Sequence, residues 1–242
     1  MHLQDNHMNS IKQGTKLIIA LVCTGIIMQN CKKSVSNLNG VVSFLRGSAS
    51  IEKNGTTTPV KSGQPVTEGD TIVTAENSTA IVDFGTAASI EVQSNSRFHI
   101  SKTGNDLEFF QEKGNTWLSS NKLLKDQSVS LKTPTTVAGV RGTKFYTYRF
   151  GDIVGTCHCE GQVEMTNAVS NKKSVNKSDY LLVQKNDKLI TLSPDDLREI
   201  NLPYSHDHSE LDNSKLGKKV SMTPEQTQIM MGFIEKKLRE AK

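Results

Sequence analysis

Short runs of strand-forming residues, broken by turn residues, limit the fold of this chain more than any other feature. Between residues 40 and 192, alternating or apolar runs are separated by Gly, Asn, Asp and Pro. Such runs are typical of strands that bury one face, and the separating residues favour turns. The runs at 79–84, 89–92 and 97–100 predict these inward-facing residues: Ala80, Val82, Phe84, Ile90, Val92, Phe98 and Ile100. The sequence therefore predicts an all-β body, either a short-stranded β-sandwich or a solenoid-like arrangement.

The stretch from Thr133 to Phe145 interrupts the strand pattern in a specific way. Pro134 lacks a backbone N–H and restricts the residue before it to extended geometry. Gly139 and Gly142 favour a close approach of two backbones or a positive φ. We expect this stretch to turn the chain between strands, with Arg141 bonded to nearby carbonyl oxygens. A carboxylate or phosphate bound by the forked donors of Arg141 is the alternative.

The same stretch resembles the signature of the FecR-type periplasmic domain. In that signature a Thr-Pro, a small apolar run and an Arg-Gly-Thr-x-Phe follow one another. The matching residues are Thr133, Pro134, Gly139, Arg141, Gly142, Thr143 and Phe145. Upstream motifs, including Gly-Asp-x-Ile-x-Thr at 69–74, follow the family order, so the resemblance covers about residues 40–166. It implies a non-catalytic domain that binds, senses or scaffolds an envelope partner: a protein, peptidoglycan or a glycan.

FecR proteins proper differ from this chain in their N-terminal part. They carry a cytoplasmic anti-sigma domain before a membrane helix. This sequence has no room for such a domain before its N-terminal apolar segment. We therefore do not expect the chain to regulate a sigma factor.

The N-terminal segment has the pattern of a bacterial export signal. Lys12 and Lys16 precede an apolar run from Leu17 to Met28, and Cys31 follows shortly after. A run of about a dozen apolar residues is too short to span a hydrocarbon core of ~30 Å. Cys31 lies where a lipoprotein signal carries its lipidated cysteine, although residues 27–30 depart from the usual lipobox. A buried helix or an uncleaved anchor is the alternative.

Lipidation of Cys31 would determine where the protein resides. Two acyl chains hold a protein to a membrane far better than one. The sequence thus predicts a lipoprotein of the bacterial cell envelope, facing the periplasm or the cell surface. Met8 is an alternative start to Met1.

The expected organisation places all of the strands in one domain. The expected parts are a signal peptide at 1–30, a tether at 31–39, the FecR-type all-β domain at 40–192, a short helix with a polar connector at 193–221, and a C-terminal helix at 222–242. Thr223 and Pro224 favour a helix start, and the apolar face of that amphipathic helix carries Met230, Phe233, Ile234 and Leu238. We expect this helix to dock on the β body, with a partner protein as the alternative.

A cysteine-histidine pattern near the end of the domain could carry chemistry. Cys157 and Cys159, two residues apart in an expected strand, would project from one face, and His158 would point away. His206 and His208 repeat this spacing downstream. Together they would supply a Cys₂His₂ set for Zn²⁺ or another transition metal, which would make the chain a metal-binding or thiol-redox protein. A disulfide, or two thiols packed as small apolar side chains, are the alternatives.

Several function classes are disfavoured by the sequence. The net charge is only +4 and the lysines are mostly scattered, so no nucleic-acid partner is expected. No catalytic triad, nucleophile elbow or His-Glu-x-x-His motif is visible, so we expect no enzymatic activity. Four acidic residues are expected to cap turns or lie on solvated sheet faces: Asp70, Asp83, Glu91 and Glu160. Trp117 is expected to pack in the core.

Overall fold

The computed structural model describes residues 39–121, 123, 125–140, 142–176, 180–220 and 222–241. The predictions for the signal peptide, most of the tether, Cys31 and Arg141 concern residues outside these ranges. Within them, no helix combines the length and the apolar character needed to cross a membrane.

The described strands form two sheets that share one long strand, β9 (Asp106–Ser120). Sheet A has the spatial order β4 (Pro65–Val66), β1 (Gly40–Arg46), β6 (Thr79–Phe84), β7 (Ala88–Val92), β9, β12 (Lys144–Phe150), β13 (Ile153–Glu160), β16 (Leu181–Lys185) and β17 (Lys188–Leu192). Sheet B has the order β3 (Thr56–Pro59), β2 (Ala49–Lys53), β5 (Thr71–Thr74), β8 (Arg97–Lys102), β9, β10 (Ser128–Lys132), β11 (Thr136–Val140), β14 (Val163–Asn167) and β15 (Lys173–Asn176). Among these pairs only β9 and β10 run parallel.

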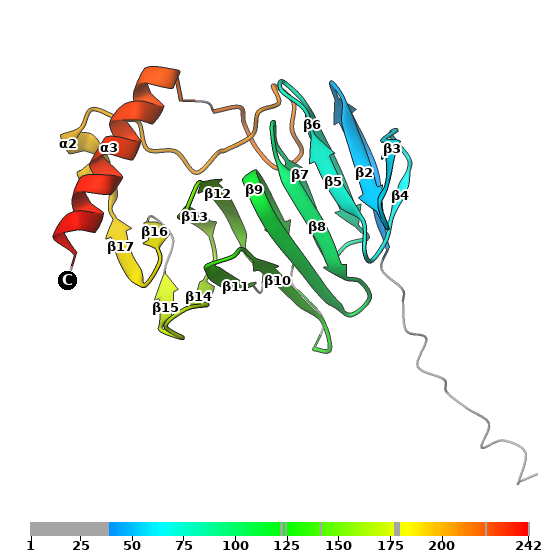
Figure 1. The fold of residues 1–242 in the computed structure, drawn as a ribbon, viewed down its shortest axis with the longest axis horizontal. Helices are drawn as coiled ribbons and strands as arrows, with labels where there is room; N and C mark the ends of the chain where they lie inside the picture. Colours follow the sequence, from blue (N-terminus) through cyan, green and yellow to red (C-terminus); the bar gives the residue numbers. More distant parts are fainter. Residues whose placement is uncertain are drawn as a thin grey trace, which may run out of the picture. The chain divides into compact units, whose positions relative to one another are not determined.

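Strand β9, the long green arrow in Figure 1, belongs to both sheets. Its first part pairs with β8 and β10 in sheet B, and its second part pairs with β7 and β12 in sheet A. Gly114, between the two parts, has a φ of +85°. A Cβ there would lie 2.2 Å from Oγ of Ser96, so the crossing requires glycine for both conformation and space.

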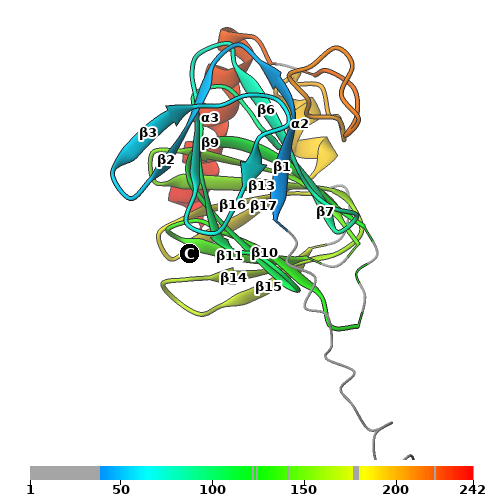
Figure 2. The same cartoon turned by 90° about the vertical axis from the view of Figure 1, so that its right-hand side faces the viewer.

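The main core lies between the two sheets. Figure 2 shows β10, β11, β14 and β15 in a layer apart from that of β13, β16 and β17. Both sheets contribute residues to one apolar cluster, so the structure has the sandwich, one of the two arrangements that the sequence left open. All seven residues predicted to face inward on β6, β7 and β8 are buried. The all-β class is thus confirmed.

The stretch 133–145 turns the chain between strands, as predicted. The hydroxyl of Thr133 accepts a hydrogen bond from the backbone N–H of Thr136 at 3.0 Å, just before β11. Gly142 has a φ of +63°, which meets the expectation for this residue. The expectation for Gly139 is wrong, because it lies within β11, has no positive φ, and has open space where a Cβ would project.

Two capped helices follow the strands, as predicted. Ser193 caps α2 (Pro194–Glu199) and Thr223 caps α3 (Pro224–Glu240), each through a capping box. Helix α3 buries Met230, Ile234 and Leu238 in a second apolar cluster, on the face of sheet A that lies away from sheet B. This outer face of sheet A is therefore covered by the C-terminal segment, and the predicted docking of the helix is confirmed.

Residues 204–220, here called the strap, join the two helices. In Figure 1 this orange segment leaves α2, reaches β6 and β7, and returns to α3. Leu211 and Leu216 are buried against Ile81 and Trp117 on the outer face of sheet A. The strap is thus a packed part of the fold, in contrast to the polar connector expected there. Trp117 is fully buried, as predicted.

Candidate metal centre

Strand β13 places both cysteines on the outer face of sheet A. Cys157 and Cys159 are 5% and 6% exposed and belong to the cluster that α2 and α3 cover. Cys157 lies opposite Tyr146 of β12. Cys159 lies where the register of β12 and β13 shifts. His158, between them, is fully buried and lies outside the cysteine group, in agreement with its predicted direction.

Two tyrosines of β12 form an aromatic wall beside the cysteines. Tyr148 lies opposite Gly155, where a Cβ would approach the tyrosine ring to 2.0 Å. The absence of a side chain at Gly155 thus makes room for that ring. Burial raises the pKa of the hydroxyl groups of Tyr146 and Tyr148, so both stay neutral.

The strap places His208 beside the two cysteines. The buried carboxylate of Glu91 holds the strap in this position. This carboxylate accepts hydrogen bonds from the Ser209 hydroxyl at 2.8 and 3.0 Å, the Glu210 backbone N–H at 2.9 Å and the Ser214 hydroxyl at 2.8 Å. Gln93 donates both to Glu91 and to the carbonyl oxygen of His208. The prediction that Glu91 caps a turn or faces solvent is therefore wrong.

A second carboxylate, that of Glu210, fastens the strap to neighbouring strands. It accepts hydrogen bonds from the Thr79 hydroxyl at 2.9 Å and from the hydroxyl and backbone N–H of Ser94 at 2.8 and 3.0 Å. Arg46 donates to the Glu210 carbonyl oxygen at 2.8 Å. Ser209 and Glu210, the two residues that follow His208, are thus both held in place by hydrogen bonds to the strands.

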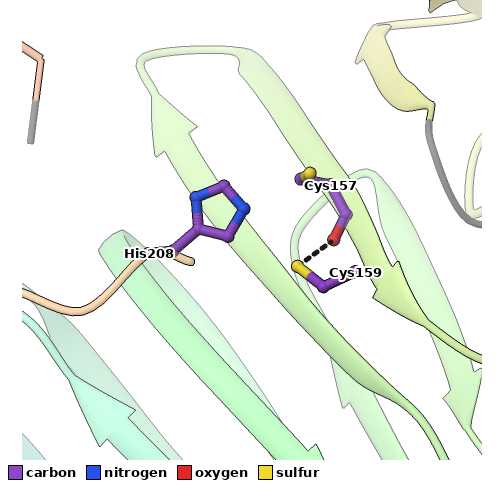
Figure 3. Close-up of side chains that lie close together, drawn as sticks. All are labelled: Cys157, Cys159 and His208. Atoms are coloured by element: carbon purple, nitrogen blue, oxygen red, sulfur yellow. Dashed lines mark hydrogen bonds between the residues drawn. The ribbon is translucent and has the colours of Figure 1, made fainter. Parts of the chain in front are cut away.

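The ring of His208 contacts two aromatic side chains. Figure 3 shows that the same ring faces Cys157 and Cys159. It stacks on Tyr146 at 4.5 Å between ring centroids, and Trp117 meets it edge-on at 6.0 Å. Nε2 of His208 is buried, and no described residue forms a hydrogen bond with it. One donor atom from each of Cys157, Cys159 and His208 lies within 4.8 Å of the others.

Three of the four predicted ligands therefore come together, and the fourth does not. His206 lies outside the group and places its ring edge-on to Tyr204, with 5.0 Å between centroids. It is still near enough to Cys157 to lower the pKa of that thiol. The sequence has no signal that separates His206 from His208, because the path of the strap decides between them.

The two cysteines are free thiols and influence each other strongly. The hydrogen bond with Cys159 lowers the pKa of Cys157 well below its usual value; burial opposes this shift, and His208 adds to it. The same hydrogen bond, together with burial, raises the pKa of Cys159. The pair thus favours one thiolate, at Cys157, and one thiol. A thiolate beside an imidazole can ligate a soft metal ion or react as a nucleophile.

The part of the chain that carries the two cysteines is similar to a known protein family. Residues 70–164 match the family model described as FecR protein, a range that includes Cys157 and Cys159 but ends before His208. Two crystal structures of a proposed anti-sigma factor from Parabacteroides distasonis ATCC 8503, at 1.65 and 2.50 Å resolution, are similar at 11% identity and a TM-score of 0.45. Each similarity covers 51% of this chain and only 59% of the other. A search of curated proteins found no match.

Proposed function

We propose, from the FecR domain that this chain carries at residues 70–164, that the protein is a non-catalytic sensing and binding module of the bacterial envelope. The family match is the observation that carries this proposal. The chain would be held at the membrane by lipid on Cys31 and would present the two-sheet domain to the periplasm or the cell surface.

The outer face of sheet B is the surface we assign to a partner. Its strands alternate buried residues with partly exposed ones, as in β5, β8 and β10, so side chains on this face reach solvent. Its charges are paired within the face, since Arg97 bonds Glu52 and Glu112, each at 2.7 Å. A surface of mutually paired charges suits an envelope protein better than a polyanion.

Lipid anchoring is tested by labelling cells with a radioactive or clickable fatty acid. The wild-type chain should take up label and sediment with membranes, whereas Cys31→Ala should lose the label and leave the membrane fraction. Equal labelling of the two chains, or membrane attachment without any label, would show that Cys31 is not the anchor.

The binding face is tested by site-specific photo-crosslinking in intact cells. A photoreactive residue at His99, on the outer face of sheet B, should yield one discrete adduct with an envelope protein. The same residue at Ile229, on the exposed side of α3, is the matched control and should not. Adducts from Ile229 alone would place the binding surface elsewhere. Co-sedimentation with purified peptidoglycan, without a protein adduct, would identify a glycan partner instead.

A further inference from the structure

We propose that Cys157, Cys159 and His208 bind one Zn²⁺ ion, which fastens the strap to sheet A. This inference is independent of the proposed sensing function, because it concerns the outer face of sheet A.

The distances suit such an ion. Zinc binds thiolate sulfur at ~2.3 Å and imidazole nitrogen at ~2.0–2.1 Å, so tetrahedral donors lie about 3.5–3.8 Å apart. The three donor atoms here lie within 4.8 Å of one another. Side-chain movements of about 1 Å would bring them to bonding distance.

The kind of donor selects the kind of ion. The group consists of two sulfur atoms and one imidazole nitrogen and contains no carboxylate. Ca²⁺ and Mg²⁺ require oxygen ligands, whereas thiolate and imidazole together favour Zn²⁺. Three protein donors leave one position of a tetrahedral ion for a water molecule or an external ligand.

The unpartnered polar atoms around the site are a second observation that points to a ligand. Among the described residues, the buried Nε2 of His208 and the buried indole N–H of Trp117 have no hydrogen-bond partner. The indole N–H lies close to the thiol of Cys159. A metal ion would accept the lone pair of Nε2, and the resulting thiolate at Cys159 would give the indole N–H a charged acceptor.

The charge of a zinc-bound site would balance. Zn²⁺ would bind both cysteines as thiolates, and one Zn²⁺ neutralises two of them, which offsets the cost of burying their charge.

The fold holds the donors in place before any ion binds. Glu91 and Glu210 fix the backbone on the C-terminal side of His208, and Tyr146 orients its ring by stacking. Cys157 is fixed by pairing of β13 with both β12 and β16. Little conformational entropy would therefore be lost on binding. The ion would join a strand inside the FecR match to a strap outside it.

The test uses the full-length chain in detergent, with Cys23→Ser and Cys31→Ser so that Cys157 and Cys159 are its only cysteines. Under reducing conditions it should bind one equivalent of Co²⁺, with a thiolate-to-cobalt charge-transfer band that Zn²⁺ removes. Cys157→Ser and His208→Ala should each abolish the band or weaken binding by more than the ~10–100-fold typical of outer-shell changes. His99→Ala, which alters a histidine bonded to Thr71 in sheet B, is the control and should bind normally.

Two further outcomes decide the ligand set. His206→Ala should keep the full charge-transfer band; if it loses the band while His208→Ala keeps it, the assignment of His208 is wrong. Absence of any cobalt band from the folded parent chain would overturn the proposal.

The single tryptophan reports the role of the ion, because Trp117 lies beneath the strap. Zn²⁺ should slow the hydrogen exchange of strap amides and shift the fluorescence of Trp117, in the parent chain but not in His208→Ala. Circular dichroism confirms that each variant is folded. Unchanged exchange at saturating Zn²⁺ would show that the ion does not fasten the strap.

Discussion

Glu91 is a carboxylate with no solvent exposure, in a strand whose other buried residues are apolar. Five hydrogen bonds reach it from the described residues: one from Gln93, which follows directly after the strand, and four from hydroxyl and backbone donors of the strap. Such charge-assisted bonds are stronger than neutral ones, and a buried anion that loses them is costly. We therefore expect Glu91 to contribute strongly to holding the strap on the sheet, together with Glu210.

Glu91→Gln should lower the free energy of unfolding by about 2–3 kcal/mol, because the amide keeps the shape but offers one acceptor atom in place of two charged ones. Urea denaturation measures the change. The matched control is Glu160→Gln, whose side chain is 71% exposed and only 3.7 Å from Lys144, and it should change stability by less than about 0.5 kcal/mol. Equal midpoints for the two variants would show that Glu91 does not hold the strap.

The candidate site could be predicted only in part at this scale. Strand alternation was enough to place Cys157 and Cys159 together and His158 outside the group, even though the register of β12 and β13 shifts at Cys159. Alternation has no meaning in the irregular strap, so it could not separate His206 from His208. That choice depends on Glu91 and Ser209, which are 118 residues apart in sequence.

At the scale of single elements, the sequence predicted helix starts well, because the groups that form a helix cap are close together in the sequence. The capping boxes at Ser193 and Thr223 predict both helix starts, because the bonded groups are three residues apart. Gly142 and Gly139 show the limit of such signals. Both occur in one motif, but only Gly142 adopts a positive φ, which depends on how β11 and β12 are paired.

Helix α2 carries a carboxylate whose ionisation joins it to α3. The backbone N–H and hydroxyl of Ser193 lower the pKa of Asp196 from its ordinary value of 3.8, and Lys237 of α3 adds to this at 3.1 Å. A carboxylate with a lowered folded-state pKa stabilises the fold above its unfolded pKa. That contribution is lost as the pH falls through the folded value.

Asp196→Asn should therefore be less stable than the wild type near neutral pH, by about 1 kcal/mol at most, because the side chain is still 23% exposed and solvent screens its charge in part. The difference should shrink as the pH falls below the ordinary pKa of 3.8 and through the lowered pKa of the folded state, where the wild-type carboxyl also becomes protonated. Denaturation at a series of pH values measures it. A difference that does not shrink on acidification would contradict the linkage. Asp195→Asn is the matched control, since its side chain is 79% exposed and pairs with Arg198 of the same helix.

At the scale of the whole molecule, the arrangement depends on β9 joining both sheets. The sequence predicts the all-β class and one core, because alternation and turn residues are local. It does not predict that one strand pairs with β8 and β10 first and with β7 and β12 afterwards. Those partners are set by contacts between distant segments. Gly114 is the one local sign of the crossing.

Gly114→Ala tests the crossing of β9 between the two sheets, and Gly104→Ala is its control. The two glycines have similar backbone conformations but different surroundings. Gly114 has a φ of +85° and Gly104 one of +96°, so alanine at either site is strained by about 1–2 kcal/mol. A Cβ at Gly104 meets nothing within 4 Å, whereas at Gly114 it would lie 2.5 Å from the Cα of Ser96. Backbone cannot move aside as a side chain can, so Gly114→Ala should cost at least about 2 kcal/mol more than Gly104→Ala. Thermal and urea unfolding of the two variants measure this difference, and equal costs would mean that β8 and β9 separate easily at the crossing.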